Sequence, residues 1–407
     1  MASPSLILLA PIQPAPSGNG LAMRCELFRR AALRDFVVET VVVPVAGVAP
    51  LPRRGGVAGA LEVAPDGAHA RAGVRSLLLE PAWRERLARA GRLPRGARAA
   101  SPGLAEAVAQ ALGGRSFDAL HVMRAYMAPL GVALAERLAV AASTLDLDDD
   151  DAAVFASVYR DRAAARAYER LLDVFGGLYG GLCAASPIDA RTISDRHGLE
   201  VEHVPNAIEL PRATRHRRAD ELRLLFVGNL TYRPNVEAAR MLVGAVLPRL
   251  RAILGERALR LTLAGSAHAD VEALASASVR VLGFVEDLNG VYADADVVVA
   301  PLHGGGGTRI KVLEAFAHGV PVVATPAAVE GLAVADGRHV LLAADADGLA
   351  AAVEAVAADH ALTARLVEHA RRLVRERYSY EAVIPQVSAF LSGAARTGGA
   401  RQPVGSS

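Results

Sequence analysis

Lysine is almost absent from this chain, and cysteine, asparagine and aromatic residues are scarce. Two cysteines far apart in the sequence, Cys25 and Cys183, exclude a disulfide framework and a cysteine-based zinc site, and they fit a reducing cytoplasm. No run of 18 uninterrupted apolar residues occurs, so no membrane-spanning helix is predicted. The apolar residues 6–9 end before Pro11 and follow no basic residue, so we expect no signal peptide.

The composition is otherwise that of a folded protein with a large core. The chain has 407 residues, 52% of them hydrophobic and 22% charged, which excludes global disorder and favours two or three domains. The net charge of +2 indicates no polyanionic partner, and scattered arginines with 4% aromatic residues argue against nucleic-acid binding. The 44 arginines stand against a single lysine, Lys311, a bias typical of GC-rich genes. A lysine retained under such a bias is more often chemically needed.

Short apolar runs alternate with longer amphipathic segments along the chain. Such runs lie at residues 6–10, 37–43, 119–122 and 141–145 in the first half, and at residues 222–227, 259–263, 279–282, 296–300, 321–324 and 340–342 in the second half. Strands that alternate with helices predict parallel sheets covered on both faces. We therefore expect an α/β protein made of two Rossmann-like, doubly wound units.

The expected domain boundaries follow from changes in composition. Residues 1–208 are predicted to form an N-terminal domain and residues 221–378 a C-terminal domain, joined by a hinge at residues 209–220 that is rich in arginine and histidine. Residues 379–392 are predicted to form a last helix, and the Gly- and Ser-rich residues 393–407 a disordered tail.

A glycine-rich loop carries the strongest functional signal. Residues 301–316 read PLHGGGGTRIKVLEAF, in which a strand is followed by four glycines and a helix predicted to begin near Thr308. Glycines let the backbone curl around a ligand, and a helix start presents unpaired amides and a positive dipole end, which favour a phosphate. Arg309 and Lys311 add positive charge, and Glu314 on the same helix face could accept hydrogen bonds from two sugar hydroxyls. The structural alternative is a flexible loop with Thr308 as the helix cap and a Lys311–Glu314 surface pair.

Two further loops each connect a predicted strand to a helix. Residues 226–235 read FVGNLTYRPN, where Arg233 could reach a diphosphate and Asn235 could cap the following helix. The other loop contains Gly18, Asn19 and Gly20, and an ordinary turn explains it equally well.

The acidic run at residues 146–151, DLDDDD, imitates a metal-binding motif. No histidine or cysteine accompanies it, and such a run more often meets the dipole of a helix N-terminus, so no metal site is predicted. His121 ends a predicted strand and is a candidate catalytic residue, although a strand-end histidine is commonly a packing residue.

An arginine-rich segment at residues 84–98 follows Trp83 and contains six arginines against one glutamate: Arg84, Arg86, Arg89, Arg92, Arg95 and Arg98. It could dock on an anionic membrane, or steer a phosphorylated ligand. Gly91 and Pro94 interrupt any long amphipathic helix, which favours the third interpretation, a solvated segment.

Together these motifs resemble the retaining glycosyltransferases of family four, which have the GT-B fold. The resemblance is carried by GGGGTRIKVLEAFAHGVPVVATPAAVEGL at residues 304–332, FVGNLTYRPN at residues 226–235, VLGFVEDLNGVYADADVVVAP at residues 281–301 and HVPNAIE at residues 203–209. FDALHVMRAYMAP at residues 117–129 and the loop at residues 18–20 match more weakly.

The resemblance implies two Rossmann-like domains that face a cleft, with residues 1–208 on the acceptor side, and a last helix that returns to the N-terminal domain. It also implies a nucleotide-sugar donor held mainly by the C-terminal domain, without a metal or another cofactor. A UDP-sugar is the expected donor and a GDP-sugar the second choice. The acceptor cannot be read from the motifs, and a glycan, a lipid-linked molecule and a small molecule all stay open.

Individual residues take roles through the same resemblance. Glu314 matches the second glutamate of the family motif E-x7-E, which binds the nucleotide ribose, and Val285 matches the backbone position that reads the base. The loop amides near Thr308 match those that cradle the donor phosphate and sugar. The candidate donor-binding residues are Gly18, Asn19, Gly20, Gly228, Asn229, Arg233, Val285, Gly306, Gly307, Thr308 and Glu314. The candidate catalytic residues are Lys311, Arg309 and His121.

Three positions depart from the family pattern. Gly306 stands where the motif has its first glutamate, a ligand of the donor sugar. Asn229 stands where the family often has a phosphate-binding arginine, and Met123 replaces the second histidine of an H-x-H pattern. These departures concern the donor sugar and the catalytic histidine, whereas they leave diphosphate binding intact.

The predicted activity is the transfer of a sugar from a nucleotide sugar to an acceptor hydroxyl with retention of anomeric configuration, by a metal-independent, same-face attack. A nucleotide-sugar epimerase of the same fold and a non-catalytic, nucleotide-sugar-binding partner subunit are the alternatives. The protein is expected in the cytoplasm, with the arginine-rich segment as its candidate contact with the inner face of the membrane.

Overall fold

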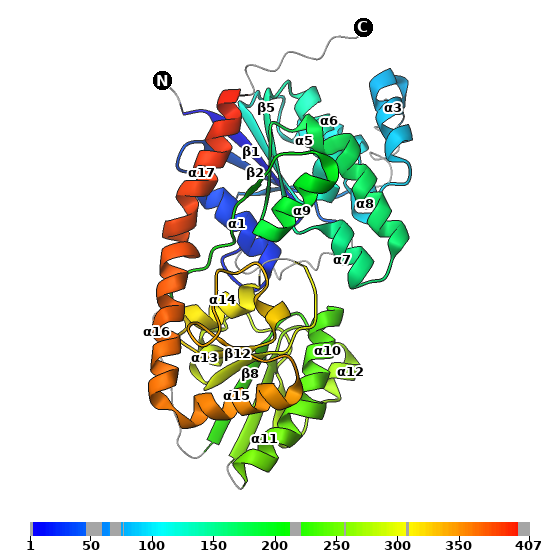
Figure 1. Ribbon diagram of the computed structural model, residues 1–407. Helices are drawn as coiled ribbons and strands as arrows, with labels where there is room; N and C mark the ends of the chain where they lie inside the picture. Colours follow the sequence, from blue (N-terminus) through cyan, green and yellow to red (C-terminus); the bar gives the residue numbers. More distant parts are fainter. Residues whose placement is uncertain are drawn as a thin grey trace. The chain divides into compact units, whose positions relative to one another are not determined.

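The computed structural model describes residues 3–45, 59–65, 75, 77–211, 221–255, 258–306 and 309–397. The chain forms two compact units, each built on its own sheet (Figure 1). Unit 1 comprises Met1–Asn206 and Val383–Ser407, and unit 2 comprises Ala207–Ala382. Most of the predicted hinge, residues 212–220, lies outside the described residues.

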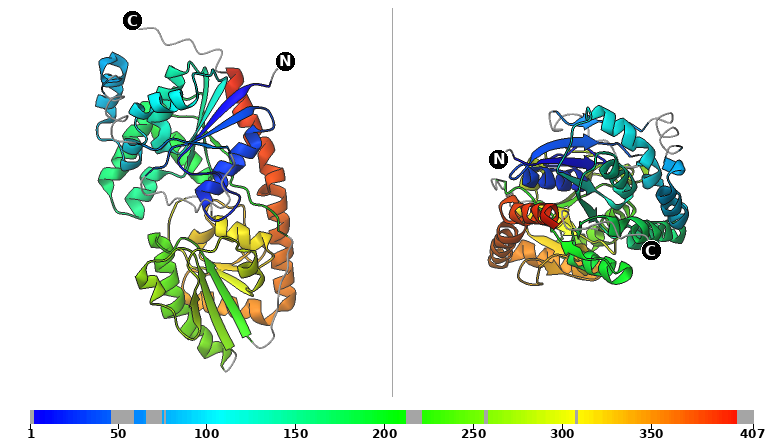
Figure 2. Two further views of the ribbon diagram at one scale, coloured as in Figure 1. Left: turned by 180° about the vertical axis from the view of Figure 1, so that it is seen from behind. Right: turned by 90° about the horizontal axis from the view of Figure 1, so that it is seen from above.

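Unit 1 contains a seven-stranded parallel sheet in the order β3-β2-β1-β4-β5-β6-β7. Its strands are β1 (Ser5–Ala10), β2 (Val37–Val42), β3 (Leu61–Glu62), β4 (Ala119–Met123), β5 (Ala142–Asp148), β6 (Gly181–Ala184) and β7 (Val201–His203). The central strands β1 and β4 are buried along almost their whole length because helices cover both faces of the sheet (Figure 2). Ile7 and Leu9 on β1 and Leu120 on β4 accordingly lie in the core.

The helices of unit 1 follow the strands along the chain. They are α1 (Gly20–Ala32), α3 (Pro81–Ala90), α4 (Arg95–Ala99), α5 (Ala105–Ala111), α6 (Ala128–Arg137), α7 (Asp151–Ser157), α8 (Arg162–Phe175) and α9 (Pro187–His197), with short 3-10 turns at Pro102–Leu104, Ala125–Met127 and Gly176–Leu178. The last helix, α17 (Tyr380–Thr397), also contributes to this unit from Val383 onward. Its Phe390 lies edge-on to the His121 ring, with 6.3 Å between ring centroids, and the Ser388 hydroxyl donates to Asp35.

Unit 2 contains a six-stranded parallel sheet in the order β10-β9-β8-β11-β12-β13. Its strands are β8 (Glu221–Val227), β9 (Ala258–Ala264), β10 (Val279–Val281), β11 (Val297–Ala300), β12 (Val322–Ala324) and β13 (Leu341–Leu342). Its helices are α10 (Arg233–Met241), α11 (Leu247–Leu254), α12 (Ala269–Glu272), α13 (Asn289–Ala293), α14 (Ile310–Ala317), α15 (Ala346–Ala358) and α16 (His360–Arg377), with a 3-10 turn at Pro326–Val329.

The predicted fold class is confirmed, because both sheets are parallel and of Rossmann-like α/β type. The segment between β8 and β9 forms two helices, α10 and α11, separated by a π-helical turn at Leu242–Val246. The helix α17 continues to Thr397, past the predicted start of a tail at residue 393, and its last turns contain the good helix formers alanine and arginine. Among the helices of the described ranges, none has the length and apolarity that crossing a bilayer requires.

Candidate functional site

Two loops of unit 2 lie side by side at the carboxyl edge of its sheet. The β8–α10 loop and the β11–α14 loop follow strands that pair in parallel, Val297 with Leu224 and Val298 with Leu225, so both loops leave the sheet at the same edge. Ligands of open parallel sheets bind at this edge. The glycine-rich loop predicted from the sequence is the second of the two.

Lys311 connects the two loops. It lies in the first turn of α14, and its ammonium donates a hydrogen bond to Oδ1 of Asn235 in α10. The same nitrogen lies 4.5 Å from the ring centroid of Phe226 on β8. Burial, together with the charge of Arg309, lowers the pKa of Lys311 to about 7. The lysine of the chain therefore places its charge at the β8–α10 loop.

Glycines make this close approach possible. A Cβ atom at Gly228 would lie 2.8 Å from the Lys311 Nζ atom. Gly265, which follows β9, has a φ of +142°, and a Cβ there would lie 1.8 Å from the Gly228 carbonyl oxygen. Only residues without a side chain fit where these backbones meet.

Glu314 lies one turn after Lys311 on α14, and a tyrosine from a different helix binds it. The hydroxyl of Tyr292 on α13 donates to Glu314 Oε2 at 3.0 Å. Tyr292 is completely buried, and its ring stacks on His318 with 4.4 Å between centroids. Burial raises the pKa of Glu314 to about 7, although the Tyr292 hydrogen bond and the Lys311 charge act in the opposite direction.

Arg309 points back at its own loop. It is the N-cap residue of α14, and its guanidinium donates to the carbonyl oxygens of Gly306 at 3.0 Å and Gly305 at 2.9 Å. Its side chain is 6% exposed and lies 3.6 Å from Glu330. The helix therefore begins at Ile310, two residues later than predicted, and Arg309 holds the loop by its carbonyl groups. Gly307 and Thr308 lie outside the described residues.

Three predicted donor-binding residues line the neighbouring loops. Asn229 forms an Asx turn, in which its Oδ1 accepts from the Thr231 amide at 3.1 Å. Arg233 donates to Glu237 at 2.8 Å on the exposed side of α10. Val285 follows Gly283, whose carbonyl oxygen accepts from the Gly265 amide at 2.8 Å. The loop that contains Val285 is thus tied to the end of β9.

The predicted N-terminal loop lies in unit 1, where it starts a helix. Asn19 is the N-cap of α1, and its Oδ1 accepts from the amides of Leu21 at 2.9 Å and Ala22 at 3.3 Å. Gly18 has a φ of +91°, and Gly20 is the first residue of α1. The Asn19 side-chain oxygen is therefore engaged in capping.

His121 is enclosed in the core of unit 1. Its ring stacks on Phe28 with 4.4 Å between centroids, and its Nδ1 atom lies 2.7 Å from the Thr144 hydroxyl. Burial lowers the pKa of His121 to about 3, so the imidazole is neutral at physiological pH. Met123, two residues later on β4, is also buried.

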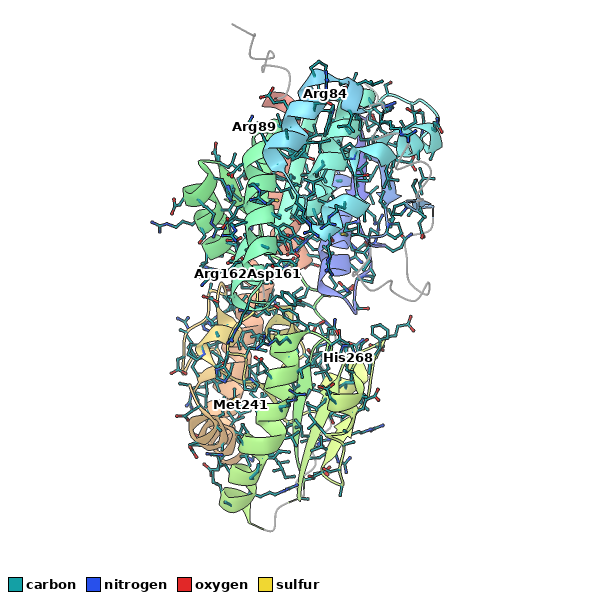
Figure 3. All side chains as sticks on the ribbon, turned by 90° about the vertical axis from the view of Figure 1, so that its right-hand side faces the viewer. Arg84, Arg89, Asp161, Arg162, Met241 and His268 are labelled. Atoms are coloured by element: carbon teal, nitrogen blue, oxygen red, sulfur yellow. The ribbon has the colours of Figure 1, made fainter. Side chains whose placement is uncertain are left out.

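The arginine-rich segment forms α3 and α4 of unit 1. Figure 3 shows Arg84 and Arg89 on α3, where both residues are exposed. Trp83 is 1% exposed and donates through Nε1 to Glu136 at 2.7 Å, and Arg86 binds the same carboxylate at 2.6 Å. Within the described ranges, no three His, Cys, Asp or Glu side chains are grouped so that they could hold a metal ion.

Sequence reasoning did not identify the residues that hold Lys311 and Glu314. Asn235 was expected to cap α10, but Tyr232 occupies the cap position and Asn235 binds Lys311. The rarity of asparagine in the chain was the available signal for this residue. Tyr292 and Gly265 gave no local signal, because their partners are 22 and 37 residues away in the sequence.

Comparisons with known proteins agree with this architecture. Residues 221–359 match the family model described as glycosyl transferases group 1. Glycogen synthase from Mycobacterium tuberculosis is 31% identical over 236 residues, which are 54% of this chain and 55% of that protein. The lipopolysaccharide core biosynthesis glycosyltransferase LpsE from Rhizobium meliloti is 34% identical over 26% of this chain and 32% of its own length. The chain thus spans about half, or less, of the length of the curated relatives it matches.

Solved structures with the GT-B fold align over nearly the whole chain. HepE from Anabaena in complex with UDP and glucose aligns with a TM-score of 0.68 at 14% identity, covering 96% of this chain and 99% of its own. Sucrose-phosphate synthase from Thermosynechococcus elongatus aligns with a TM-score of 0.69 at 18% identity, covering 96% and 98%. Residues 221–359 therefore match a glycosyl transferases group 1 domain, and the aligned structures confirm the GT-B fold that the motifs predicted.

Proposed function

We propose that this protein is a glycosyltransferase that moves a sugar from a nucleotide-sugar donor to an acceptor hydroxyl, with retention of anomeric configuration and without a metal ion. The observation that carries the proposal is the position of Lys311. Its ammonium lies at the β8–α10 loop, beside Gly228 and Asn235, in a domain that matches the group 1 family. A cation at the carboxyl edge of the sheet fits a diphosphate.

Each part of the donor has a proposed ligand in unit 2. Glu314 accepts hydrogen bonds from the ribose hydroxyls, and Tyr292 fixes its carboxylate. Lys311 binds the diphosphate, which compensates for the neutral Asn229 in the adjacent loop. The backbone of Val285 reads the base. Arg309 is a positioning residue, because its guanidinium holds the carbonyl groups of the loop that receives the donor.

The chemical step needs stabilisation of the leaving diphosphate. Negative charge grows on it as the glycosidic bond breaks, and Lys311 and the dipole of α14 meet that charge. Glu314 is committed to the ribose, so no carboxylate is assigned as a nucleophile. We propose that the acceptor attacks from the face that the diphosphate leaves, and that the departing phosphate oxygen takes the acceptor proton.

A UDP-sugar is the preferred donor, because the related structures of HepE contain UDP or UDP-glucose. A GDP-sugar is the second choice. The missing glutamate at Gly306 favours a non-catalytic, nucleotide-sugar-binding subunit as the rival function, and a nucleotide-sugar epimerase is the rival enzyme.

The test is incubation of the protein with UDP-glucose, UDP-N-acetylglucosamine and GDP-mannose without an acceptor, followed by proton NMR of the sugar. We expect one donor to bind and to be hydrolysed slowly to the free sugar with its original anomeric configuration. Inversion at a carbon of the intact donor would identify an epimerase, and tight binding without turnover would identify a binding subunit.

The same assay run in EDTA tests metal independence. Hydrolysis is expected to continue at an unchanged rate, because Lys311 and the helix dipole supply the positive charge. An EDTA-sensitive rate that Mg²⁺ or Mn²⁺ restores would contradict this part of the proposal.

A further inference from the structure

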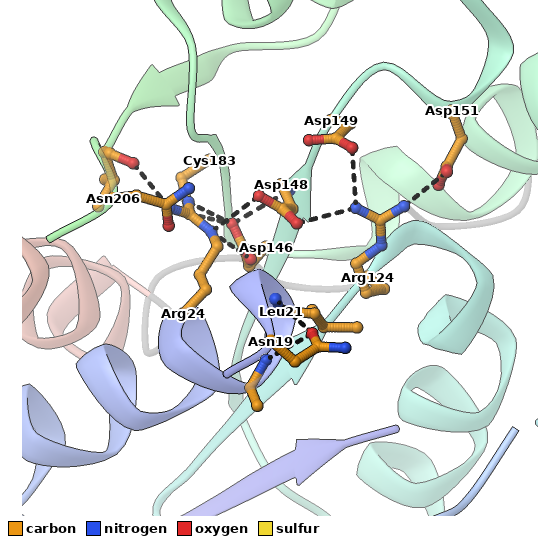
Figure 4. A network of polar contacts seen from close by, with 12 residues as sticks. Asn19, Leu21, Arg24, Arg124, Asp146, Asp148, Asp149, Asp151, Cys183 and Asn206 are labelled. Atoms are coloured by element: carbon orange, nitrogen blue, oxygen red, sulfur yellow. Dashed lines mark hydrogen bonds and ion pairs between the residues drawn. The ribbon is translucent and has the colours of Figure 1, made fainter. Parts of the chain in front are cut away.

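Five aspartates lie at the carboxyl end of β5 and directly after it in unit 1, and Figure 4 shows four of them in a network of ion pairs with Arg24 and Arg124. Asp146 forms a bidentate pair with the buried Arg24, at 2.7 and 2.8 Å. Asp150 caps α7 by accepting from the Ala153 amide at 3.0 Å, and it pairs with Arg196 at 2.9 Å. These two carboxylates are each matched by one guanidinium.

The other three aspartates surround one arginine. Arg124 lies 3.0 Å from Asp148, 3.6 Å from Asp149 and 2.6 Å from Asp151. Arg24 approaches Asp148 only to 3.6 Å and is already engaged with Asp146. Five carboxylates therefore face three guanidiniums, which leaves an excess of negative charge around Arg124. In agreement, burial and the neighbouring aspartates raise the pKa of Asp149.

A buried phenol points to a ligand at the same place. Tyr126 follows β4 and is 6% exposed, and its hydroxyl has no hydrogen-bond partner within the part of the chain that the structure describes. The Arg124 guanidinium lies 5.8 Å from its ring centroid, and burial, with a smaller contribution from the charge of Asp151, raises the pKa of the Tyr126 hydroxyl. One oxygen of Asp151 and the Nε of Arg124 also lack partners among the described residues. Buried polar atoms normally have partners, so these three atoms indicate a ligand that both donates and accepts hydrogen bonds.

The surroundings combine this charge with aromatic rings. Phe155 stacks on Tyr168 with 5.2 Å between centroids and lies 5.1 Å from the ring of Tyr159, which is 47% exposed. Burial raises the pKa of both tyrosines, and the charge of Asp151 makes a smaller contribution in the same direction. The Asp149 side chain is 23% exposed, so the cluster is accessible to solvent on that side. Carboxylates flanked by aromatic rings are a favourable environment for an ammonium group.

We propose that the edge formed by Arg124, Asp149, Asp151 and Tyr126 binds a ligand that carries a protonated amine. The identification of this ligand rests on the proposed transfer function: the ligand is the acceptor, and it is an amino sugar or a similar amine-bearing polyol. The ammonium offsets the unmatched aspartate charge and donates to Asp151 and Tyr126. A neutral polyol would leave that charge unmatched, and a divalent metal does not fit three carboxylates that Arg124 already engages.

Binding of small sugars without nucleotide tests the proposal directly. Glucosamine, which is protonated at neutral pH, is titrated into the full chain and followed by saturation-transfer NMR, with glucose and N-acetylglucosamine as uncharged counterparts. We expect glucosamine to bind at least tenfold more tightly than either neutral sugar. Equal affinity for all three would overturn the proposal.

Two variants locate the site. Asp149→Asn is expected to lower glucosamine affinity at least fivefold, and Tyr126→Phe, which removes one oxygen, at least threefold, with thermal midpoints near that of the wild type. Asp195→Asn on α9, whose side chain is 76% exposed, is the matched control and should bind like the wild type. If both site variants bind glucosamine as the wild type does, the site is wrongly placed.

UDP binding, measured by calorimetry on the same samples, separates the two proposals. UDP binding without an amine preference would overturn only the inference about the acceptor. A preference for glucosamine without UDP binding would overturn the proposed function and leave the ammonium site as a property of unit 1.

Discussion

Lys311 and Glu314 are separated by less than one turn of α14, and residues from two different helices hold their side chains. Asn235 on α10 accepts from Lys311, and Tyr292 on α13 donates to Glu314. The amino group and the carboxyl group are therefore held by different helices, as the proposed roles at the diphosphate and at the ribose require. Preorganised charges of this kind stabilise a transition state without rearrangement during the reaction.

Replacement of Glu314 tests its proposed contact with the ribose. Glu314→Gln is expected to weaken UDP binding at least tenfold, about 1.4 kcal/mol, because an amide cannot accept two charge-assisted hydrogen bonds. Tyr292→Phe should show a smaller loss, since it removes only the hydroxyl that fixes the carboxylate. Calorimetry with UDP measures both, with Glu272→Gln on α12 as an exposed control. Wild-type UDP affinity in Glu314→Gln would refute the assignment.

The pKa of Lys311 predicts a specific dependence of stability on pH. The folded-state pKa of about 7 lies below the ordinary value of 10.5, so between pH 7 and 10.5 the unfolded chain binds a proton that the folded chain does not. The free energy of unfolding therefore gains a contribution that rises with pH across this window, and the cost of burying the ammonium is complete below pH 7. Lys311→Met should abolish that rise and also lower UDP affinity.

Thermal unfolding from pH 6 to pH 10.5, without ligand, measures the effect. The control is Lys311→Arg, which keeps its charge throughout this range and should therefore also lack the rise while retaining the cost of burial. Wild-type and Lys311→Met curves that run parallel over the window would show that the ammonium is not held as described.

At the level of secondary-structure elements, the β8–α10 loop and the end of β9 come so close together that the choice of residue type is most restricted there. Gly265 combines a φ of +142° with direct contact to the Gly228 carbonyl group. Gly265→Ala is expected to destabilise the protein by about 2–4 kcal/mol, because the strained backbone and the overlap cannot both be relieved locally. Gly228 would be displaced from Lys311, so UDP binding should fall as well.

Gly290→Ala on α13 is the matched control for this substitution. A Cβ atom there meets nothing within 4 Å, and alanine is the better helix former, so its stability should equal or slightly exceed that of the wild type. Thermal or urea unfolding compares the two variants. A Gly265→Ala protein as stable as Gly290→Ala would contradict the described close approach of the two segments.

The elements predicted correctly are those with a strong local signal. The apolar runs of β1, β2, β4, β8 and β9 were placed within one or two residues, because strands buried on both faces are continuously hydrophobic. The strands β6 and β7 were missed, since their short runs GLCA and VEH contain glycine or charged residues. The π-helical turn at Leu242–Val246 also has no periodicity that sequence reasoning could detect.

The candidate site was predicted in part for the same reason. The glycines, Lys311 and Glu314 stand within one short segment and form a readable motif, whereas the groups that hold them come from distant helices. The direction of the Arg309 side chain depends on the curl of the loop, which the residue types do not specify. Local spacing therefore identified which residues carry charge, and only the fold showed where that charge is directed.

At the level of the whole molecule, the remaining question from the sequence is whether the arginine-rich segment attracts the protein to a membrane. Of its six arginines, Arg86 is paired with Glu136 and lies over the Trp83 ring at 5.0 Å. Trp83 is buried, so the residue best suited to a membrane interface is unavailable. The helix α3 ends after ten residues because Gly91 adopts a φ of +61°.

These contacts predict that the protein stays in solution at physiological salt. The exposed arginines attract anionic lipid by about 1 kcal/mol each only when they lie close to the surface together, and screening weakens this attraction at 150 mM salt. In co-sedimentation with phosphatidylserine vesicles at 150 mM salt, we expect the protein in the supernatant. At 20 mM salt a minor fraction should sediment, and Arg84→Gln with Arg89→Gln should return it to the supernatant.

Two exposed leucines beside α3 could also bind a bilayer and so compete with the expected result, since Leu79 is 80% exposed and Leu78 is 41% exposed. If they insert into the bilayer, sedimentation at 150 mM salt will persist and Leu79→Ser will abolish it, whereas the arginine substitutions will have less effect. That outcome would contradict the prediction, since apolar burial is insensitive to screening by salt. It would also place the acceptor on a membrane, and a water-soluble amine would then have to be reconsidered as the natural ligand of unit 1.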